Sequence, residues 1–426
     1  MEILNRKVQP AFKKIENIDI VKLEKNNLSN NIPVYIINAG TQDVVKIDMI
    51  FNAGTWCQEV PLQASITNSM ITEGTKKLSS KQITEKLDFY GAFIQQNIDF
   101  DNNIVSLISL NKHLPHTITI LEDIIKNACF PEKEFEILIK NKKQNYILEG
   151  NKTSILARRK FLLEIFGKEH PYGNRVDLTD FSDLKNNKTK SFYNKFYSSD
   201  NCKIIVSGKI QNNLLSDINN YFGQDDWQKQ FEPVENSYNI NPGKSQKHFV
   251  NKENAVQSAI RIGKKLFNKL HPDYLQMLVL NTILGGYFGS RLMANIREDK
   301  GYTYGIGSIV HSLKNSGYFS IITEVGSDVK NKAIDEIYKE IEKLKTELVP
   351  DNELELVKNY LMGDIMRTLD GPFSLSESYM SLLNYDLDFS YFKKLTNTIK
   401  NITSIEIQRL ANDYLDINSM YEIVAG

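Results

Sequence analysis

The chain repeats itself at about half its own length, and this duplication is the strongest restriction on how it can fold. Residues 190–208 and 408–426 both combine the end of a helix, a polar turn and a short β-rich strand. The two segments close on Gly208 and Gly426, which lie 218 residues apart in a chain of 426. A spacing of this size predicts two copies of one structural unit rather than one long domain.

Each half shows a similar order of strand-like and helix-like segments. We therefore expect an α+β fold of two homologous α/β domains, in which strand and helix units are duplicated and each mixed, mainly antiparallel sheet is packed by helices. The boundaries are expected at residues 1–225 and 245–426, with a polar linker at residues 226–244.

The first half is expected to begin with two strands, 32–38 and 44–52, which a hairpin-like turn at residues 39–43 connects. Two helices and a second strand pair follow, and helical periodicity dominates residues 117–166. The second half is expected to repeat this order, with strands at 256–262, 304–312 and 318–325 and helices at 273–284, 329–345, 352–369 and 403–414.

The charge balance and the hydrophobic pattern exclude several function classes. The 52 basic and 52 acidic residues give a net charge of zero, so the usual electrostatic attraction to nucleic acid or anionic lipid is absent. No run of about 18 apolar residues predicts a membrane span. We expect no nucleic acid and no membrane as partners, and a cytoplasmic chain, or a periplasmic one if a leader has been removed.

One stretch of the second half is rich in residues suited to chemistry. Gly285, Gly286 and Gly289 precede a helix that bears Arg297, and Tyr304 follows where a strand begins. In one interpretation the glycines form a tight turn, Arg297 pairs on a solvated helix face and Tyr304 is half-buried on a sheet. In the other, the guanidinium and the phenol converge on a substrate, and the glycines let extended backbone approach.

This stretch resembles the second-domain signature of the pitrilysin/insulinase family of zinc metallopeptidases, which includes mitochondrial processing peptidase and bacterial two-chain relatives. The signature reads small-Ser-Arg-Leu, four residues, then Arg-Glu-x-x-Gly-x-x-Tyr, and the chain matches it from Gly289 to Tyr304. Shorter matches extend the resemblance over nearly the whole length, at residues 51–55, 73–75, 170–173 and 353–361. The family is also built from a duplicated domain, so the resemblance implies the pitrilysin fold.

The zinc motif of the family is replaced in this chain. Catalytic members carry an inverted motif, His-x-x-Glu-His, shortly before a Gly-Thr pair, and it aligns here with Ser65, Asn68 and Ser69. Serine hydroxyls are weak zinc ligands compared with imidazole and carboxylate, and asparagine cannot take a proton from water. Residues 1–112 contain no histidine, and residues 143–145, near the third ligand's position, include no acid. We therefore expect no metal and no cofactor in this chain.

The resemblance implies that Arg297 and Tyr304 help to bind the carbonyl group of the scissile peptide. Gly285, Gly286 and Gly289 are candidates for substrate binding because glycines let extended backbone approach, and a tight turn is their alternative role. We expect the non-catalytic subunit of a heterodimeric zinc metalloendopeptidase, whose homologous partner carries the His-x-x-Glu-His motif and the zinc. Alone, the chain is expected to have no peptidase activity, and a homodimer is possible. The alternative is a proteolytically inert structural or peptide-binding scaffold of the same fold.

Overall fold

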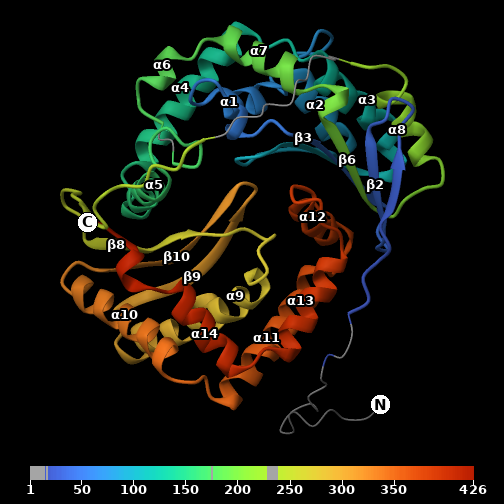
Figure 1. Cartoon of the computed structure of the whole chain (residues 1–426). Helices are drawn as coiled ribbons and strands as arrows, with labels where there is room; N and C mark the ends of the chain where they lie inside the picture. Colours follow the sequence, from blue (N-terminus) through green and yellow to red (C-terminus); the bar gives the residue numbers. More distant parts are fainter. Residues whose placement is uncertain (1–14, 16–17, 174–175, 228–237) are drawn as a thin grey trace, which may run out of the picture.

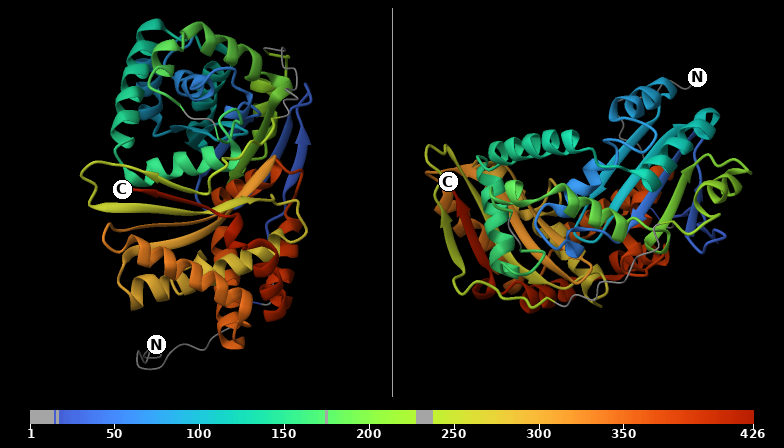
Figure 2. Two further views of the ribbon diagram at one scale, coloured as in Figure 1. Left: turned by 60° about the vertical axis from the view of Figure 1, so that its left-hand side comes forward. Right: turned by 90° about the horizontal axis from the view of Figure 1, so that it is seen from above.

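The computed structural model describes residues 15, 18–173, 176–227 and 238–426, which form two β-sheets covered by helices (Figure 1). The expected linker at residues 226–244 lies partly outside this description, because residues 228–237 do. In the left view of Figure 2, helices of the first half lie at the top and the orange helices of the second half at the bottom. In the described residues, no helix is long and apolar enough to cross a membrane.

The first half contains a six-stranded sheet in the order β1-β2-β6-β3-β5-β4. Valine and isoleucine fill its buried central positions, because branched side chains pack well on a pleated surface. The strands are β1 (Glu24–Asn27), β2 (Pro33–Asn38), β3 (Val44–Phe51), β4 (Phe93–Ile98), β5 (Asn103–Leu110) and β6 (Cys202–Gly208). The helices are α1 (Gln63–Met70), α2 (Ser80–Tyr90), α3 (Leu114–Asn127), α4 (Glu132–Glu149), α5 (Thr153–Phe166), α6 (Asp180–Asp183), α7 (Asn186–Phe196) and α8 (Leu214–Phe222).

The second half contains a five-stranded sheet in the order β7-β11-β8-β10-β9. Its strands are β7 (Lys247–Val250), β8 (Gln257–Leu266), β9 (Thr303–Leu313), β10 (Ser316–Gly326) and β11 (Tyr421–Ala425). Its helices are α9 (Tyr274–Asn281), the π-helical segments η4 (Thr282–Gly286) and η5 (Met293–Asp299), α10 (Lys330–Thr346), α11 (Asp351–Thr368), α12 (Pro372–Leu383), α13 (Ser390–Asn401) and α14 (Ser404–Tyr414).

Both sheets have the same mixed character. In the first sheet β2 runs parallel to β6, and in the second β7 runs parallel to β11, whereas the other described pairs are antiparallel. Each sheet is therefore mixed and mainly antiparallel, with helices packed on it. The expected α+β fold is confirmed.

The hairpin expected between residues 32–38 and 44–52 is wrong. Both strands form, as β2 and β3, but β6 lies between them, parallel to β2 and antiparallel to β3. A short connection between two strands favours a hairpin when only local sequence is considered. Here a strand from the end of the first half supplies the hydrogen-bonding partner of both, so the connection crosses over one strand.

Each half covers part of the sheet of the other half. Helix α5 packs on β8 and β11, and helix α12 packs on β6 and β2 (Figure 1). Beneath α5, Phe161 and Phe166 belong to the same buried cluster as Ile423 of β11. Beneath α12, the hydroxyl of Ser376 donates a hydrogen bond to Oδ2 of Asp48, a fully buried residue of β3, at 2.7 Å. The two halves are therefore joined by both an apolar and a polar contact.

Candidate functional site

The residues that replace the zinc motif lie on α1, where Ser65 and Asn68 form hydrogen bonds within the first half. Ser65 and Ser69 are half-buried, and the Ser65 hydroxyl donates to a backbone carbonyl one turn earlier at 3.0 Å. Asn68 is 2% exposed. Its Nδ2 donates to the carbonyl oxygen of Asn97 on β4 at 3.0 Å, and its Oδ1 accepts from the Tyr197 hydroxyl at 3.4 Å. The Asn68 amide therefore holds α1 against the edge of the sheet.

These residues do not fit a zinc ion. Zinc sites use imidazole, thiolate or carboxylate donors, whereas α1 offers two hydroxyls and an amide whose nitrogen and oxygen are already hydrogen-bonded. Helix α4 packs beside α1 but presents Lys143, Gln144 and Asn145 near the expected third position. Within the described ranges, no group of three or more His, Cys, Asp or Glu side chains could hold a metal ion. No chemical step in this chain can be derived through zinc.

The glycine segment packs closely against its surroundings. A Cβ on buried Gly285 would lie 2.7 Å from the backbone nitrogen of Ser308 on β9, so this glycine lets the chain pack on the strand. A Cβ on exposed Gly289 would lie 2.8 Å from the Tyr287 ring, and one on exposed Gly286 would meet side-chain and backbone atoms at 3.2 Å. None of the three glycines has a positive φ. Close approach, rather than an unusual turn conformation, accounts for them.

The two arginines of this segment have different environments. Arg291 forms a bidentate ion pair with Glu353 on α11, with both nitrogen–oxygen distances at 2.8 Å. Arg297, on η5, has no ion pair in the described part of the chain, and its guanidinium carbon lies 4.5 Å from the ring centroid of Phe288. Phe288 is 63% exposed. The ion pair that one interpretation gave to Arg297 belongs to Arg291, and the Arg297 guanidinium rests on an aromatic face.

Tyr304 stands on a β-bulge in the edge strand of the second sheet. Between the pairs Thr303–Val325 and Ile306–Thr323, β9 contains one residue more than β10. The hydroxyls of Thr303 and Thr323 reinforce this irregularity by donating to nearby carbonyl oxygens at 2.7 and 3.0 Å. Bulges bend a strand and redirect its side chains. The Tyr304 side chain is 93% exposed, so the interpretation that places it half-buried on the sheet is wrong.

The structure brings together the elements that carry Arg297 and Tyr304, because η5 packs against β9. Gly301, with φ of +64°, begins the turn that joins them. Phe288, which supports the Arg297 guanidinium, was missed in the sequence. Its place among glycines, where a large apolar side chain has no buried face to occupy, is the signal that would have found it.

The fold and these residues define the class of protein. A family model described as insulinase (peptidase family M16) matches residues 34–177, and one described as the peptidase M16 inactive domain matches residues 183–361. The chain belongs to the peptidase M16 (insulinase/pitrilysin) family.

Particular members of the family resemble the chain over most of its length. It is 22% identical to the uncharacterized zinc protease YmxG of Bacillus subtilis over 91% of this chain and 94% of that protein. It is 23% identical to the non-peptidase homolog YmxG of Helicobacter pylori, with 84% and 82% covered. A crystal structure of a peptidase M16 inactive domain from Pseudomonas fluorescens superposes with a TM-score of 0.82 at 19% identity, covering 95% of this chain and 98% of that one. The family thus includes proteins named as active and as inactive.

Proposed function

We propose that this chain is the non-catalytic subunit of a heterodimeric M16 zinc metalloendopeptidase. A homologous catalytic subunit supplies the His-x-x-Glu-His motif, its zinc and the general base. This chain closes the peptide chamber and contributes Arg297 and Tyr304. The proposal rests on two features together. The zinc motif on α1 is replaced, and in the second half Arg297 has no ion pair among the described residues while the Tyr304 phenol is exposed.

The single observation that carries the proposal is the exposure of Tyr304. A tyrosine ring is stabilised by burial, yet a bulge reinforced by two threonine hydroxyls holds this one 93% exposed. Arg297 lies on the adjacent segment without a carboxylate partner among the described residues. A scaffold has no need of both features together, whereas a peptide carbonyl needs two such donors.

The chemistry of these two groups is stabilisation of negative charge. When water attacks a peptide bond, the carbonyl oxygen becomes an oxyanion. Guanidinium N–H groups and a phenol O–H donate hydrogen bonds to that oxygen, and losing one such donor typically costs about 2.7–4 kcal/mol of the activation barrier. In this account the partner's metal activates the water, and the residues of this chain bind the substrate's oxygen.

Tyr304 is 93% exposed, so its hydrogen bonds to a substrate are weak until water is excluded, which is why the proposal needs a partner. Hydrogen bonds and charges act more strongly in a site of low dielectric constant. Phe288 of the glycine segment is 63% exposed, and on α11, which packs against η4, Leu356 is 58% exposed and Tyr360 is 39% exposed. Tyr360 also packs against Tyr287, at 4.8 Å between ring centroids, which joins α11 to the glycine segment. Such a surface suits an interface with another subunit.

The experiment is reconstitution with substituted subunits. The tagged chain is used to capture its partner from the native source, and hydrolysis of a peptide mixture is measured for the pair. Arg297→Ala and Tyr304→Phe are each expected to lower turnover about 100-fold or more, with assembly unchanged. The half-buried neighbour Tyr302 supplies the control, Tyr302→Phe, which should retain turnover. Equal turnover in all four pairs would contradict the proposal.

The alternative function is an inert scaffold of the same fold. It is favoured by the Helicobacter pylori relative that is named a non-peptidase homolog. A neighbouring gene for the same architecture with an intact His-x-x-Glu-His motif supports the peptidase pair. A captured complex without zinc-dependent hydrolysis, or a chain that forms only a homodimer, supports the scaffold.

A further inference from the structure

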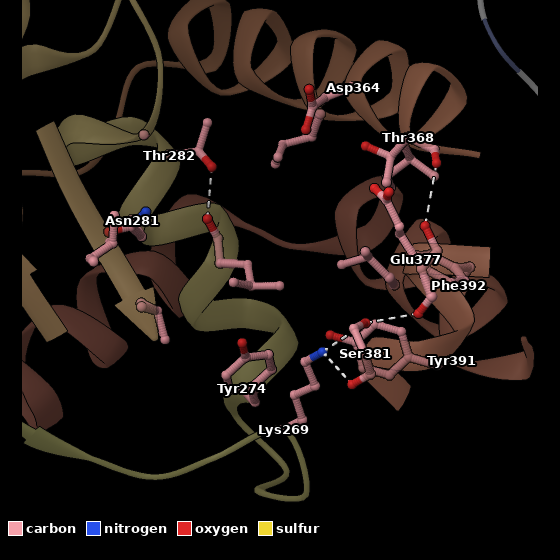
Figure 3. Close-up of a pocket in the computed structure, with 18 of the residues that line it drawn as sticks. Lys269, Tyr274, Asn281, Thr282, Asp364, Thr368, Glu377, Ser381, Tyr391 and Phe392 are labelled. Carbon is pink, nitrogen blue, oxygen red and sulfur yellow. Dashed lines mark hydrogen bonds between the residues drawn. The ribbon is translucent and has the colours of Figure 1, made fainter. Parts of the chain in front are cut away.

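A separate cavity of about 730 Å³ lies in the second half, between β9 and α9 on one side and α11, α12 and α13 on the other (Figure 3). This volume is within the usual range for small-molecule sites. Gly286 belongs to its lining, but Arg297 and Tyr304 do not. The cavity is therefore distinct from the proposed carbonyl-binding pair, and an inference about it does not depend on the proposed function.

Lys269 is the only cation that lines this cavity among the described residues. Its Nζ donates to the backbone oxygen of Ser381 at 3.0 Å and to the Ser381 hydroxyl at 3.2 Å. An ammonium group has three N–H donors, so one remains. The rings of Tyr385 and Tyr391 lie 5.4 and 5.9 Å from the nitrogen, and no carboxylate of the described residues pairs with it. Burial lowers the pKa of Lys269 to about 8, because nothing nearby compensates its charge.

The two acids in the lining already have cationic partners. Asp364, at the end of the cavity opposite Lys269 in Figure 3, pairs with Arg367 at the surface. Glu377 on α12 lies 3.7 Å from the Nζ of Lys46 in the first half. Lys46 also pairs with Asp48, at 3.3 Å, and Glu377 is 71% exposed to solvent. Lys269 is the lining charge that has neither solvent exposure nor an opposite partner among the described residues, so the ligand group that complements it is an anion.

The rest of the lining is largely apolar and includes one unpaired polar atom. Its aliphatic and phenyl side chains belong to Leu278, Ile309, Val310, Leu361, Ile365, Phe392 and Leu395, and six serine and threonine residues also line it. Asn281, 8% exposed, donates through Nδ2 to the backbone oxygen of Ser308 at 3.1 Å, but its Oδ1 has no hydrogen-bond partner among the described residues. A buried acceptor without a partner is unusual in a finished interior.

We infer that this cavity binds a carboxylate attached to an apolar chain, with the carboxylate on the ammonium of Lys269 and the chain along the apolar wall. Two sources offer this chemistry: the C-terminus of a short apolar peptide and a free aliphatic acid. Both share the carboxylate and the apolar chain, and the titration below measures each source separately.

Calorimetric titration of the full-length chain tests the inference. The probes are N-acetyl-leucyl-leucine and octanoate, each compared with its uncharged amide. We expect both acids to bind at least tenfold more tightly than their amides, a difference of about 1.4 kcal/mol or more. Binding at pH 8 should also take up about half a proton, because a bound carboxylate raises the pKa of an amine that is half protonated there.

Substitution identifies the group responsible. Lys269→Met should reduce the affinity of each acid to that of its amide. Lys264→Met is the matched control, because Lys264 is a lysine of β8 that is hydrogen-bonded to Ser419 at 2.6 Å and lies outside the cavity lining. The comparison of acid with amide on the unaltered chain stands even if a variant fails to fold. Equal affinity of acid and amide, or no binding of either acid at up to about 5 mM, would overturn the inference.

Discussion

The side-chain nitrogen of Asn68 donates a hydrogen bond to the backbone oxygen of Asn97, 3.0 Å away, and so ties helix α1 to the edge strand β4. The family resemblance assigns the general base of catalytic members to the position of Asn68. In this chain that position performs a structural task that requires a donor. The residue type at this position of the family motif and the stability of the first half are therefore linked.

Asn68→Asp should destabilise the chain by about 3 kcal/mol at pH 7, because it replaces a buried donor with a charged acceptor that faces the Asn97 oxygen. The loss should shrink in acid, where a protonated aspartate can donate. Urea unfolding at pH 5 and pH 7 measures this. The control Asn145→Asp, at an exposed position of α4, should change stability by less than about 0.5 kcal/mol. Equal stability of the two variants would show that Asn68 holds nothing in place.

The two arginines of the signature segment should differ in what they stabilise. Arg291→Ala removes a partly buried bidentate pair with Glu353 and should lower the free energy of unfolding by about 2 kcal/mol. Arg297→Ala removes only a stacking contact on Phe288 and should cost about 0.5 kcal/mol or less. Chemical denaturation of both variants checks this order. A larger loss at Arg297 would assign that residue to the structure of the domain rather than to a substrate.

Asp101 should make stability depend on pH. Burial, followed by the nearby charge of Asp99, raises the pKa of Asp101 to about 6. A raised carboxyl pKa means that the folded chain favours the protonated form, so this contribution is present in full below about pH 4 and is lost as pH rises through 6.

Asp101→Asn should remove this dependence and stabilise the chain at pH 7.5 by about 1 kcal/mol, while leaving its stability at pH 4.5 nearly unchanged. Unfolding curves at the two pH values give the comparison. If the free energy of unfolding depends on pH in the same way in the unaltered chain and the variant, a group other than Asp101 is responsible.

The contact between Ser376 and Asp48 should hold the two halves together. Ser376→Ala leaves one oxygen of the fully buried Asp48 without this donor, and a loss of about 1–3 kcal/mol is expected. Asp48 keeps the Ser106 hydroxyl at 2.5 Å and the Lys46 ammonium at 3.3 Å, so the fold should survive. Ser374→Ala, on a half-buried serine of the same helix, is the control for urea unfolding. A neutral Ser376→Ala would mean that the apolar contacts beneath α5 and α12 suffice.

Local pattern was enough to predict most elements of the fold. The β-branched runs and the helical periodicity placed β2, β3 and α11 within a few residues, because each carries its own signal in the sequence. The position of β6 between β2 and β3 could not be predicted, because strand pairing over a long sequence distance leaves no local mark. For the same reason the sequence did not reveal that α5 of the first half packs on the second sheet, or that α12 of the second half packs on the first sheet.

The site could be predicted only as a set of residue types. Arg297 and Tyr304 were found through a family signature. Which arginine forms the ion pair depends on Glu353, whose helix is far from the signature in the sequence but adjacent to it in the fold. The bulge at Tyr304 arises from a register shift against β10, and β9 alone does not reveal it. Lys269 was not singled out, because its importance comes from what surrounds it and not from any motif.

The central claim is that two chains share the catalytic groups of one peptidase. The most direct test compares zinc-dependent peptide hydrolysis by this chain alone with hydrolysis by this chain and its captured partner. Both samples are supplied with zinc and the same peptide mixture, and turnover is measured with and without a chelator. We expect no turnover above background from the lone chain and chelator-sensitive turnover from the pair. Robust chelator-sensitive hydrolysis by the lone chain would contradict the account.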